Sequence, residues 1–245
     1  MIEPIYMDAL VFSSLLTLLS IGLTMTYLTT RVPNFAHGSL AMIGTYVSLT
    51  VDKVFKASIY QNLYLSFIAS GLAALTIYLL ILKPLRNRGA SIDALMIATL
   101  AIDIILLAIF NIYTDILIRE FKAVTGRKFL LRSSDLIIFN QRAALIVSLA
   151  LVVVLTTALY LLLTRTKFGI AMRAVIENPS LAATVGINTE LVYSVSWFIA
   201  GGLAGISGGL LPLWFLCDPA FGSTIVVSIF AASIVGGLYN IYGAC

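Results

Sequence analysis

One short motif in this sequence has the residue types of a reactive serine. Ser207 stands between glycines in the pattern Gly205-Ile206-Ser207-Gly208, and a serine so placed is a candidate nucleophile for a hydrolase. Such a serine needs a base within hydrogen-bond reach. The sequence has one histidine, His37, whose neighbours predict a helix boundary, whereas Ser207 lies well inside an apolar run. The pattern also arises by chance in glycine-rich segments, so we predict no catalytic residue.

A single acidic residue stands in the middle of another apolar run. Asp103 is flanked by aliphatic residues on both sides, and an ionisable group in such a run is costly to bury. One interpretation is a group that titrates during transport by a carrier. The other is a structural carboxyl that bonds a hydroxyl, such as that of Thr99 one helical turn earlier. The sequence leaves both interpretations open.

A helix-breaking segment precedes the second apolar run. Pro33 interrupts any helix, Asn34 can cap the next one, and Gly38 permits close packing. A lone histidine beside a helix start, as His37 is, is more often hydrogen-bonded structure than a catalyst or a ligand. Because nothing nearby supplies a second ligand, we predict no metal site.

Long apolar runs carry these residues. Hydrophobic residues make up 60% of the chain and charged residues 11%, whereas a soluble domain is about one quarter charged. A transmembrane helix needs about 20 mostly apolar residues. Seven runs are candidates, at about residues 9–28, 38–54, 63–82, 94–112, 143–164, 192–214 and 224–242. Because the runs are continuous, they predict an all-α, polytopic helical membrane protein with about seven transmembrane helices in one domain, 1–245.

The sixth run is rich in glycine at helical spacing. Gly201, Gly205 and Gly209 are four residues apart and share one helix face, which permits close contact between backbones. We expect tight helix packing there rather than direct contact with a solute. Gly236 and Gly237 in the seventh run are expected to continue the same crowded interior.

The polar segment between the fifth and sixth runs has its own helix signals. Gly169 to Glu177 predicts a short amphipathic helix. Asn178 can cap a second helix and Pro179 fits its first position, which needs no N–H donor. Gly186 can adopt the left-handed conformation that ends it. Two short helices on one side of the bilayer are typical of a docking element for a soluble partner.

The sequence lacks the signatures of several function classes. It has no G-x-x-x-x-G-K-[ST] phosphate loop, so we expect no nucleotide hydrolysis by this chain. It has few charges within the apolar runs and no convincing inverted repeat, which ion-coupled carriers show. Two cysteines make neither a disulfide framework nor a metal site, and no basic run is dense enough for nucleic acid. Active transport would therefore draw its energy from a separate subunit.

Several segments together resemble the membrane permease family of branched-chain amino-acid ABC importers. The matching segments, in chain order, are Asn34-Phe-Ala-His-Gly38, Met42-Ile-Gly-Thr-Tyr46, Phe168-Gly169, Arg173-Ala174, Ala182, Gly186-Ile-Asn188, Gly201-Gly202-Leu-Ala-Gly205 through Gly209, Pro219, Gly236-Gly237 and Gly243-Ala244. Each motif is weak by itself, but their order and spacing extend over nearly the whole chain.

Three features depart from the pattern of that family. Ser180 stands where ABC permeases in general have Glu, a difference that is frequent in this subfamily. Tyr239 and Tyr242 replace residues that are typically Gly and Pro. The chain also ends at Cys245, whereas family members usually continue through at least one further helix. We therefore expect a C-terminally short chain, which is either a truncated product or fragment or an unusually short member.

The resemblance implies a permease subunit in the cell membrane that forms half of a translocation pathway with a second permease, identical or different. It implies no cofactor in this chain, with ATP and Mg bound by ABC ATPase subunits, and an extracytoplasmic substrate-binding protein as a further partner. The residues implied to couple the chain to the ATPase, in a loop at about 165–191, are Gly169, Arg173, Ala174, Glu177, Ala182, Gly186 and Asn188. Those expected in helix packing or along the pathway are Asn34, His37, Gly38, Asp103, Gly201, Gly205, Gly209, Gly236 and Gly237.

The sequence leaves two other functions open as alternatives. One is a stand-alone secondary carrier that uses Asp103, and the other is an intramembrane serine hydrolase that uses Ser207. Loop charge does not fix the orientation, because lysines and arginines are almost equally divided between the two sides. The basic cluster from Lys83 to Arg88, placed directly at a helix end, favours the cytoplasm for the side that also holds 168–188.

Overall fold

A computed structural model describes residues 4–121, 126–138 and 141–237. The helices are α1 (Pro4–Thr30), α2 (His37–Lys53), α3 (Leu63–Ile77), α4 (Lys83–Asn87), α5 (Ile92–Arg119), α6 (Ala143–Arg165), α7 (Lys167–Glu177), α8 (Pro179–Thr184), α9 (Thr189–Trp214) and α10 (Phe221–Gly236). Short helical turns cover Tyr60–Asn62 and Arg132–Ser134, and a π-helical turn covers Tyr78–Leu82. The strands β1 (Ile137–Ile138) and β2 (Gln141–Arg142) form a small antiparallel pair. The all-α prediction is confirmed.

Five of the helical segments are long and apolar enough to cross a membrane: 5–30, 60–87, 92–119, 143–165 and 189–214. The other two predicted runs correspond to α2, with 17 residues, and α10, with 16. Both are helical but shorter than a full span. The seventh run was expected to reach residue 242, and its last part lies outside the described residues.

The third span is continuous although it contains a proline. Pro84 lacks the N–H that would bond the carbonyl of Leu80, one turn earlier. The chain widens to the π-helical turn Tyr78–Leu82 just before this proline and then resumes as α4. A wider turn of this kind accommodates a missing hydrogen bond without ending the helix, so the basic cluster of α4 stays joined to the span.

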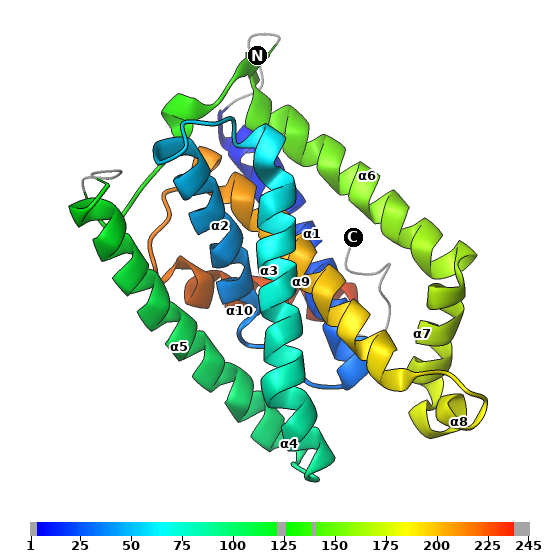
Figure 1. The fold of residues 1–245 in the computed structure, drawn as a ribbon. Coiled ribbons are helices and arrows are strands. Elements are labelled where there is room, and N and C mark those ends of the chain that lie inside the picture. The colour runs from blue at the N-terminus through cyan, green and yellow to red at the C-terminus, as the bar shows by residue number, and fades with distance from the viewer. Residues whose placement is uncertain (1–3, 122–125, 139–140, 238–245) are drawn as a thin grey trace.

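The glycine-rich helix α9 is the centre of the bundle. It packs most extensively on α3, α2 and α1, and Figure 1 shows it between them, with α5 and α6 at the two outer edges. In the most apolar stretch of α9, 78% of the residues are buried, against 11% in α6. The outer helices therefore present most of the surface that meets lipid or another subunit.

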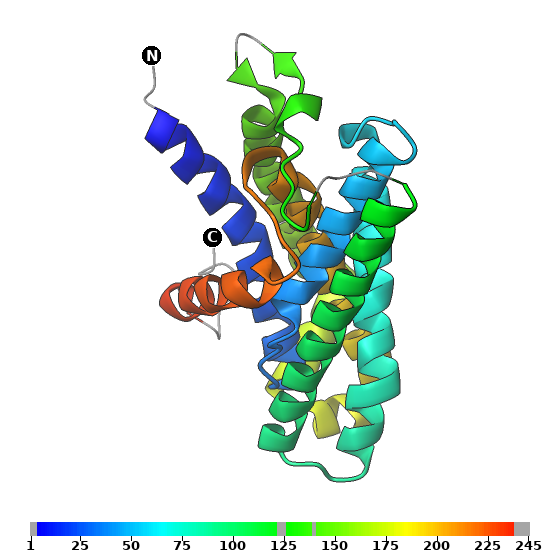
Figure 2. The ribbon, with the colours of Figure 1, turned by 90° about the vertical axis from the view of Figure 1, so that its left-hand side faces the viewer.

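Helix α10 has a different direction from the long helices. Figure 2 shows it lying across the others and projecting from the side of the bundle formed by α1. Its most extensive contacts are with α2 and α1. Several of its apolar side chains are exposed, including Val227 at 70% and Val235 at 90%.

Glycine determines how closely α9 approaches its neighbours. A Cβ atom on Gly208 would overlap the carbonyl of Ala41 in α2, and one on Gly205 would overlap the carbonyl of Ser66 in α3. Thr45 of α2 donates a hydrogen bond to the Gly208 carbonyl at 2.8 Å. Without a hydrophobic driving force between helices in lipid, such backbone contacts and hydrogen bonds hold them together.

We expect Gly208→Ala to destabilise the bundle by about 1–3 kcal/mol or more, because the added methyl group forces α9 away from α2. The measurement is the apparent melting temperature of the purified protein in detergent. Gly126→Ala is the matched control, since a Cβ at Gly126 meets no atom within 4 Å. Equal melting temperatures for the two variants would contradict this account of the packing.

Candidate functional site

The chain turns sharply from α6 into α7. Thr166 caps α7 by accepting a hydrogen bond from the Gly169 amide at 3.2 Å. A Cβ on Gly169 would overlap the carbonyl of Leu163 near the end of α6. Glycine at this position therefore allows α7 to fold back closely against the helix that precedes it.

Three residues set the boundaries of the next helices, and the sequence predicts two of them, Asn178 and Gly186. The Asn178 side chain accepts a hydrogen bond from the Leu181 amide at 3.0 Å and caps α8. Gly186 follows α8 with a φ of +86°, in the left-handed region that favours glycine. Asn188 caps α9 by accepting from the Leu191 amide at 3.0 Å.

The pair α7 and α8 buries one face and exposes the other. Met172, Val175 and Ala182 are buried, and α7 contacts α6, α9 and α1. A hydrogen bond from Arg31, just after α1, to the Ile176 carbonyl spans 3.5 Å. The pair is therefore attached to the bundle rather than extended away from it.

The outward face of α7 and α8 is apolar with a charged rim. Ile170, Leu181 and Val185 are 59%, 62% and 71% exposed. Arg173 and Glu177 are also exposed, whereas Ala174 is half-buried. An exposed apolar cluster with polar residues around it is typical of an interaction site. We call Ile170, Arg173, Glu177, Leu181 and Val185 the docking face.

An ion-pair cluster joins α4 to the start of α9 at the same end of the molecule. Arg86 pairs with Glu190 at 2.6 Å, and Lys83 lies 3.4 Å from the same carboxylate. Arg86 also donates to the Tyr78 hydroxyl at 3.2 Å and lies 4.3 Å from the centre of the Tyr193 ring. Glu190 is not among the residues singled out from the sequence, although an acid two residues after the Asn188 cap is a recognisable first-turn residue.

A second site lies near the middle of α5. Asp103 accepts hydrogen bonds from Ser39 at 2.5 Å and from Ser223 at 2.8 Å. These serines are the third residues of α2 and α10, so both helices begin level with the middle of α5. The first turns of helices carry free N–H groups and partial positive charge, which stabilises a carboxylate.

The hydroxyl suggested by the sequence for Asp103 was the wrong one. Thr99 instead accepts a hydrogen bond from the Phe35 amide at 3.2 Å and lies 3.3 Å from the Pro33 carbonyl. It therefore holds the segment before α2, and the partners of Asp103 come from helices far away in the sequence.

Gly38, the second residue of α2, allows α2 and α10 to come into contact. A Cβ on Gly38 would overlap the carbonyl of Gly222, so the first turns of the two helices touch through their backbones. Asn34 stabilises the turn before α2 by accepting from the Ala36 amide at 3.1 Å. Gly38 thus allows α2 and α10 to approach each other closely, at the level of Asp103.

Ser207 and His37 do not form a nucleophile–base pair. The Ser207 hydroxyl donates to the Leu15 carbonyl at 2.9 Å, and His37 Nε2 donates to the Leu19 carbonyl at 3.0 Å. Both side chains therefore bond successive turns of α1 rather than each other. Among the described residues, no group of three His, Cys, Asp or Glu side chains is placed to hold a metal ion.

The predicted packing glycines occupy different surroundings. Gly201 and Gly205 lie against α3, and Gly209 lies near Leu63 of α3 and Ser48 of α2. Gly236 ends α10, and Gly237 follows it with a φ of +92° and no atom within 4 Å of its Cβ position. Within the described part of the chain, this last pair forms a helix end rather than a crowded contact.

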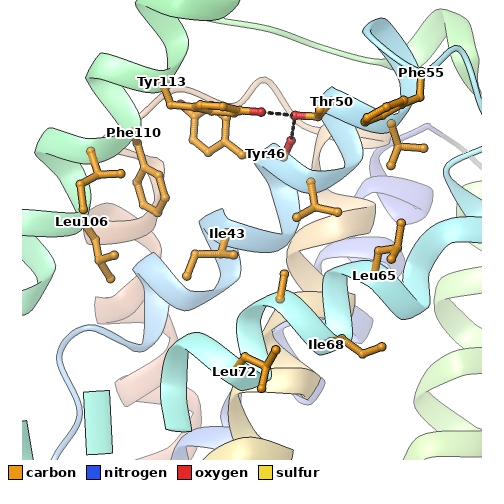
Figure 3. Close-up of a pocket in the computed structure, with 14 residues that line it drawn as sticks. Ile43, Tyr46, Thr50, Phe55, Leu65, Ile68, Leu72, Leu106, Phe110 and Tyr113 are labelled. Carbon is orange, nitrogen blue, oxygen red and sulfur yellow. Dashed lines mark hydrogen bonds between the residues drawn. The ribbon is translucent and has the colours of Figure 1, made fainter. Parts of the chain in front are cut away.

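An apolar groove of about 680 Å³ lies between α3 and α5, with α2 as its floor. Figure 3 shows Ile43, Leu65, Ile68, Leu72 and Leu106 around it. At one end the Thr50 hydroxyl lies 2.6 Å from the Tyr113 hydroxyl. The lining fits acyl chains or apolar side chains and offers little to a polar solute.

Comparison with known proteins assigns a family to this arrangement. The family described as "Branched-chain amino acid transport system / permease component" matches residues 5–245. A probable branched-chain amino acid transport permease protein LivH of Methanocaldococcus jannaschii is 50% identical over 236 residues, which is 96% of this chain and 74% of that protein. The LivH permease of Salmonella typhimurium is 25% identical and the BraD permease of Pseudomonas aeruginosa is 24% identical, each over 97% of this chain and about four fifths of its own length. No solved structure matches significantly.

We expect Asp103→Leu to lower stability by about 2 kcal/mol or more, because Ser39 and Ser223 lose their acceptor inside the bundle. Asp103→Asn should cost less, since an amide can accept from one hydroxyl and donate to the other. Both are measured as apparent melting temperatures. Asn111→Leu on the same helix is the control, because within the described part of the chain the Asn111 side chain bonds only its own helix, at the Leu107 carbonyl. A loss in Asp103→Leu no larger than in the control would show that the carboxylate does not hold α2 and α10.

Proposed function

Since the chain belongs to the branched-chain amino acid transport system permease family and is a multi-pass protein of the cell membrane, we propose that it is the permease subunit of an ATP-driven importer. Its cargo in this proposal is branched-chain amino acids or related small solutes. The permeases named above carry branched-chain amino acid transport in their names.

The docking face of α7 and α8 is the observation that supports an ATPase partner in this proposal. Three large aliphatic side chains are exposed at the polar end of a membrane protein, with Arg173 and Glu177 beside them. Large exposed aliphatic groups outside the bilayer are costly unless a partner covers them. A soluble ATPase subunit on the cytoplasmic side is the partner that supplies the energy for import.

The attachment of α7 and α8 suits the transmission of force. The Gly169 corner joins α7 directly to α6, and buried Met172 and Val175 couple it to the bundle. The Arg86–Glu190 pair fixes the start of α9 to α4 beside it. A push on the docking face would therefore reach α9, the helix around which the bundle is packed.

The proposed pathway lies between this chain and a second permease rather than through the bundle. From Ala200 to Trp214 every residue of α9 is buried, and backbone contacts with α2 and α3 occupy the centre. Such packing leaves the middle of the bundle filled. We therefore assign the two permeases one half of the pathway each.

ATP and Mg belong to the ATPase subunits in this proposal, and a substrate-binding protein delivers the solute from outside. No observation favours the alternatives. Both side-chain oxygens of Asp103 accept hydrogen bonds from serines, which gives the side chain a structural role between helices. The Ser207 hydroxyl bonds the Leu15 carbonyl rather than a base.

We expect Leu181→Glu to reduce co-purification of the ATPase about tenfold or more, because it places a charge in the apolar centre of the docking face. Arg173→Glu should also weaken the complex by reversing a charge at its rim. The measurement is the amount of ATPase retained by tagged permease when it is expressed together with the ATPase subunits of the importer.

Leu216→Glu is the matched control. Leu216 is 55% exposed and lies beyond α9, at the opposite end of the molecule from α7 and α8. This variant should retain the ATPase at the wild-type level. Normal retention by Leu181→Glu and Arg173→Glu would show that α7 and α8 are not the docking element.

A further inference from the structure

A small charged cavity lies at the end of the bundle opposite α7 and α8. Its volume is about 310 Å³, at the lower end of the range for small-molecule sites. The lining comes from α1, from the segment between α5 and α6, and from the last residue of α9. The lining residues are Met7, Asp8, Arg132, Ile137, Gln141, Arg142 and Trp214.

Backbone hydrogen bonds fix the segment that carries both arginines. The Leu131 amide donates to the Pro212 carbonyl of α9 at 2.6 Å. Phe129 and Cys217 exchange two hydrogen bonds, at 2.9 and 3.0 Å. The Ala143 amide donates to the Leu136 carbonyl at 2.8 Å, which closes the segment onto the start of α6. The cavity is therefore a built feature, and its charged side chains come from fixed backbone.

The cavity holds charges of both signs around one tryptophan. The guanidinium groups of Arg132 and Arg142 lie 5.9 and 6.0 Å from the centre of the Trp214 ring. Asp8 accepts a hydrogen bond from Trp214 Nε1 at 2.6 Å. Among the residues that the structure describes, Asp8, Arg132 and Arg142 form no ion pair. Their charges are thus available to a ligand.

We propose that this cavity is a receiving subsite for a zwitterionic α-amino acid with an apolar side chain. The two guanidinium groups would bind the α-carboxylate, for which arginine's planar donors are suited. Asp8 would bind the α-ammonium, and Met7 and Ile137 would contact the side chain. This inference rests on the proposed function, because it gives the importer a place to accept its solute before translocation.

The mixture of charges favours a zwitterion over other ligands. An acidic loop of a partner protein, or an anionic lipid headgroup, would pair with the arginines but would meet the like charge of Asp8. A free amino acid satisfies both signs at once. Binding should be weak, with a dissociation constant on the order of 1 mM, since a receiving site must also release its ligand.

Intrinsic fluorescence of the full chain in an uncharged maltoside detergent, which offers no competing zwitterionic headgroup, tests the proposal. The chain has two tryptophans, and Trp197 is fully buried in the core, so Trp214 reports on the cavity. L-leucine should produce a saturable change that is absent in Trp214→Phe. 4-Methylpentanoate, which lacks the ammonium, and isopentylamine, which lacks the carboxylate, should each bind about tenfold more weakly or worse.

Matched variants connect the signal to the named charges. Arg142→Gln and Asp8→Asn should each weaken leucine binding about tenfold, and Arg142→Lys should restore part of it. Arg119→Gln removes an exposed arginine that does not line the cavity and should leave binding unchanged. Elution as a single peak in gel filtration shows that each variant is folded.

Three results would overturn the proposal. The first is the absence of a saturable fluorescence change with leucine, and the second is an equal change with 4-methylpentanoate. The third is a change with glycerol phosphate or phosphatidylglycerol but not with leucine. The same variants in ATP-dependent leucine uptake by the assembled importer separate the two claims. Normal uptake without a Trp214 fluorescence response would contradict the subsite but not the proposed function. No uptake by the wild-type complex would contradict the proposed function itself.

Discussion

The contact of the α9 backbone with α2 and α3 is the constraint on which the rest of the structure depends. At Gly208 and Gly205 no side chain separates the helices, and carbonyl oxygens occupy the space that a Cβ would need. In lipid, where apolar burial gives helices little reason to associate, such close packing and the hydrogen bonds that accompany it supply the attraction. Because α9 is fixed on three sides, its two ends are fixed as well: Glu190 next to α4 and Trp214 next to the segment that carries Arg132 and Arg142.

A second constraint acts where two helices, α2 and α10, begin inside the molecule. Polar groups must find hydrogen-bond partners within the protein where no water is present. Asp103 satisfies serine hydroxyls in the first turns of both α2 and α10, and Gly38 allows those turns to meet at Gly222. A carboxylate that would be expensive alone is thus held between two partly positive helix ends. The acid is best understood as the joint between α2, α5 and α10.

Local signals in the sequence predicted the local structure. Asn178, Gly186 and Asn188 act at the boundaries of α8 and α9 as their residue types indicate, and the apolar runs correspond to helices. Long-range partners were not predictable: Ser39 and Ser223 for Asp103, or Glu190 for Arg86, depend on how the helices pack. The composition of the α10 segment predicts a full span, and only the structure shows that this helix lies across the bundle (Figure 2). The roles of the docking face and of the coupling residues remain predictions.

Hydrogen–deuterium exchange of the permease, alone and assembled with its ATPase subunits, tests the central claim most directly. We predict that assembly slows exchange in Lys167–Glu177 and Pro179–Thr184, since the ATPase covers the docking face and restricts opening of the two short helices. Exchange in β1 and β2, at the opposite end, should not change. Unchanged exchange in α7 and α8 in a stable complex, with protection elsewhere, would contradict the assignment of this element as the connection to the motor.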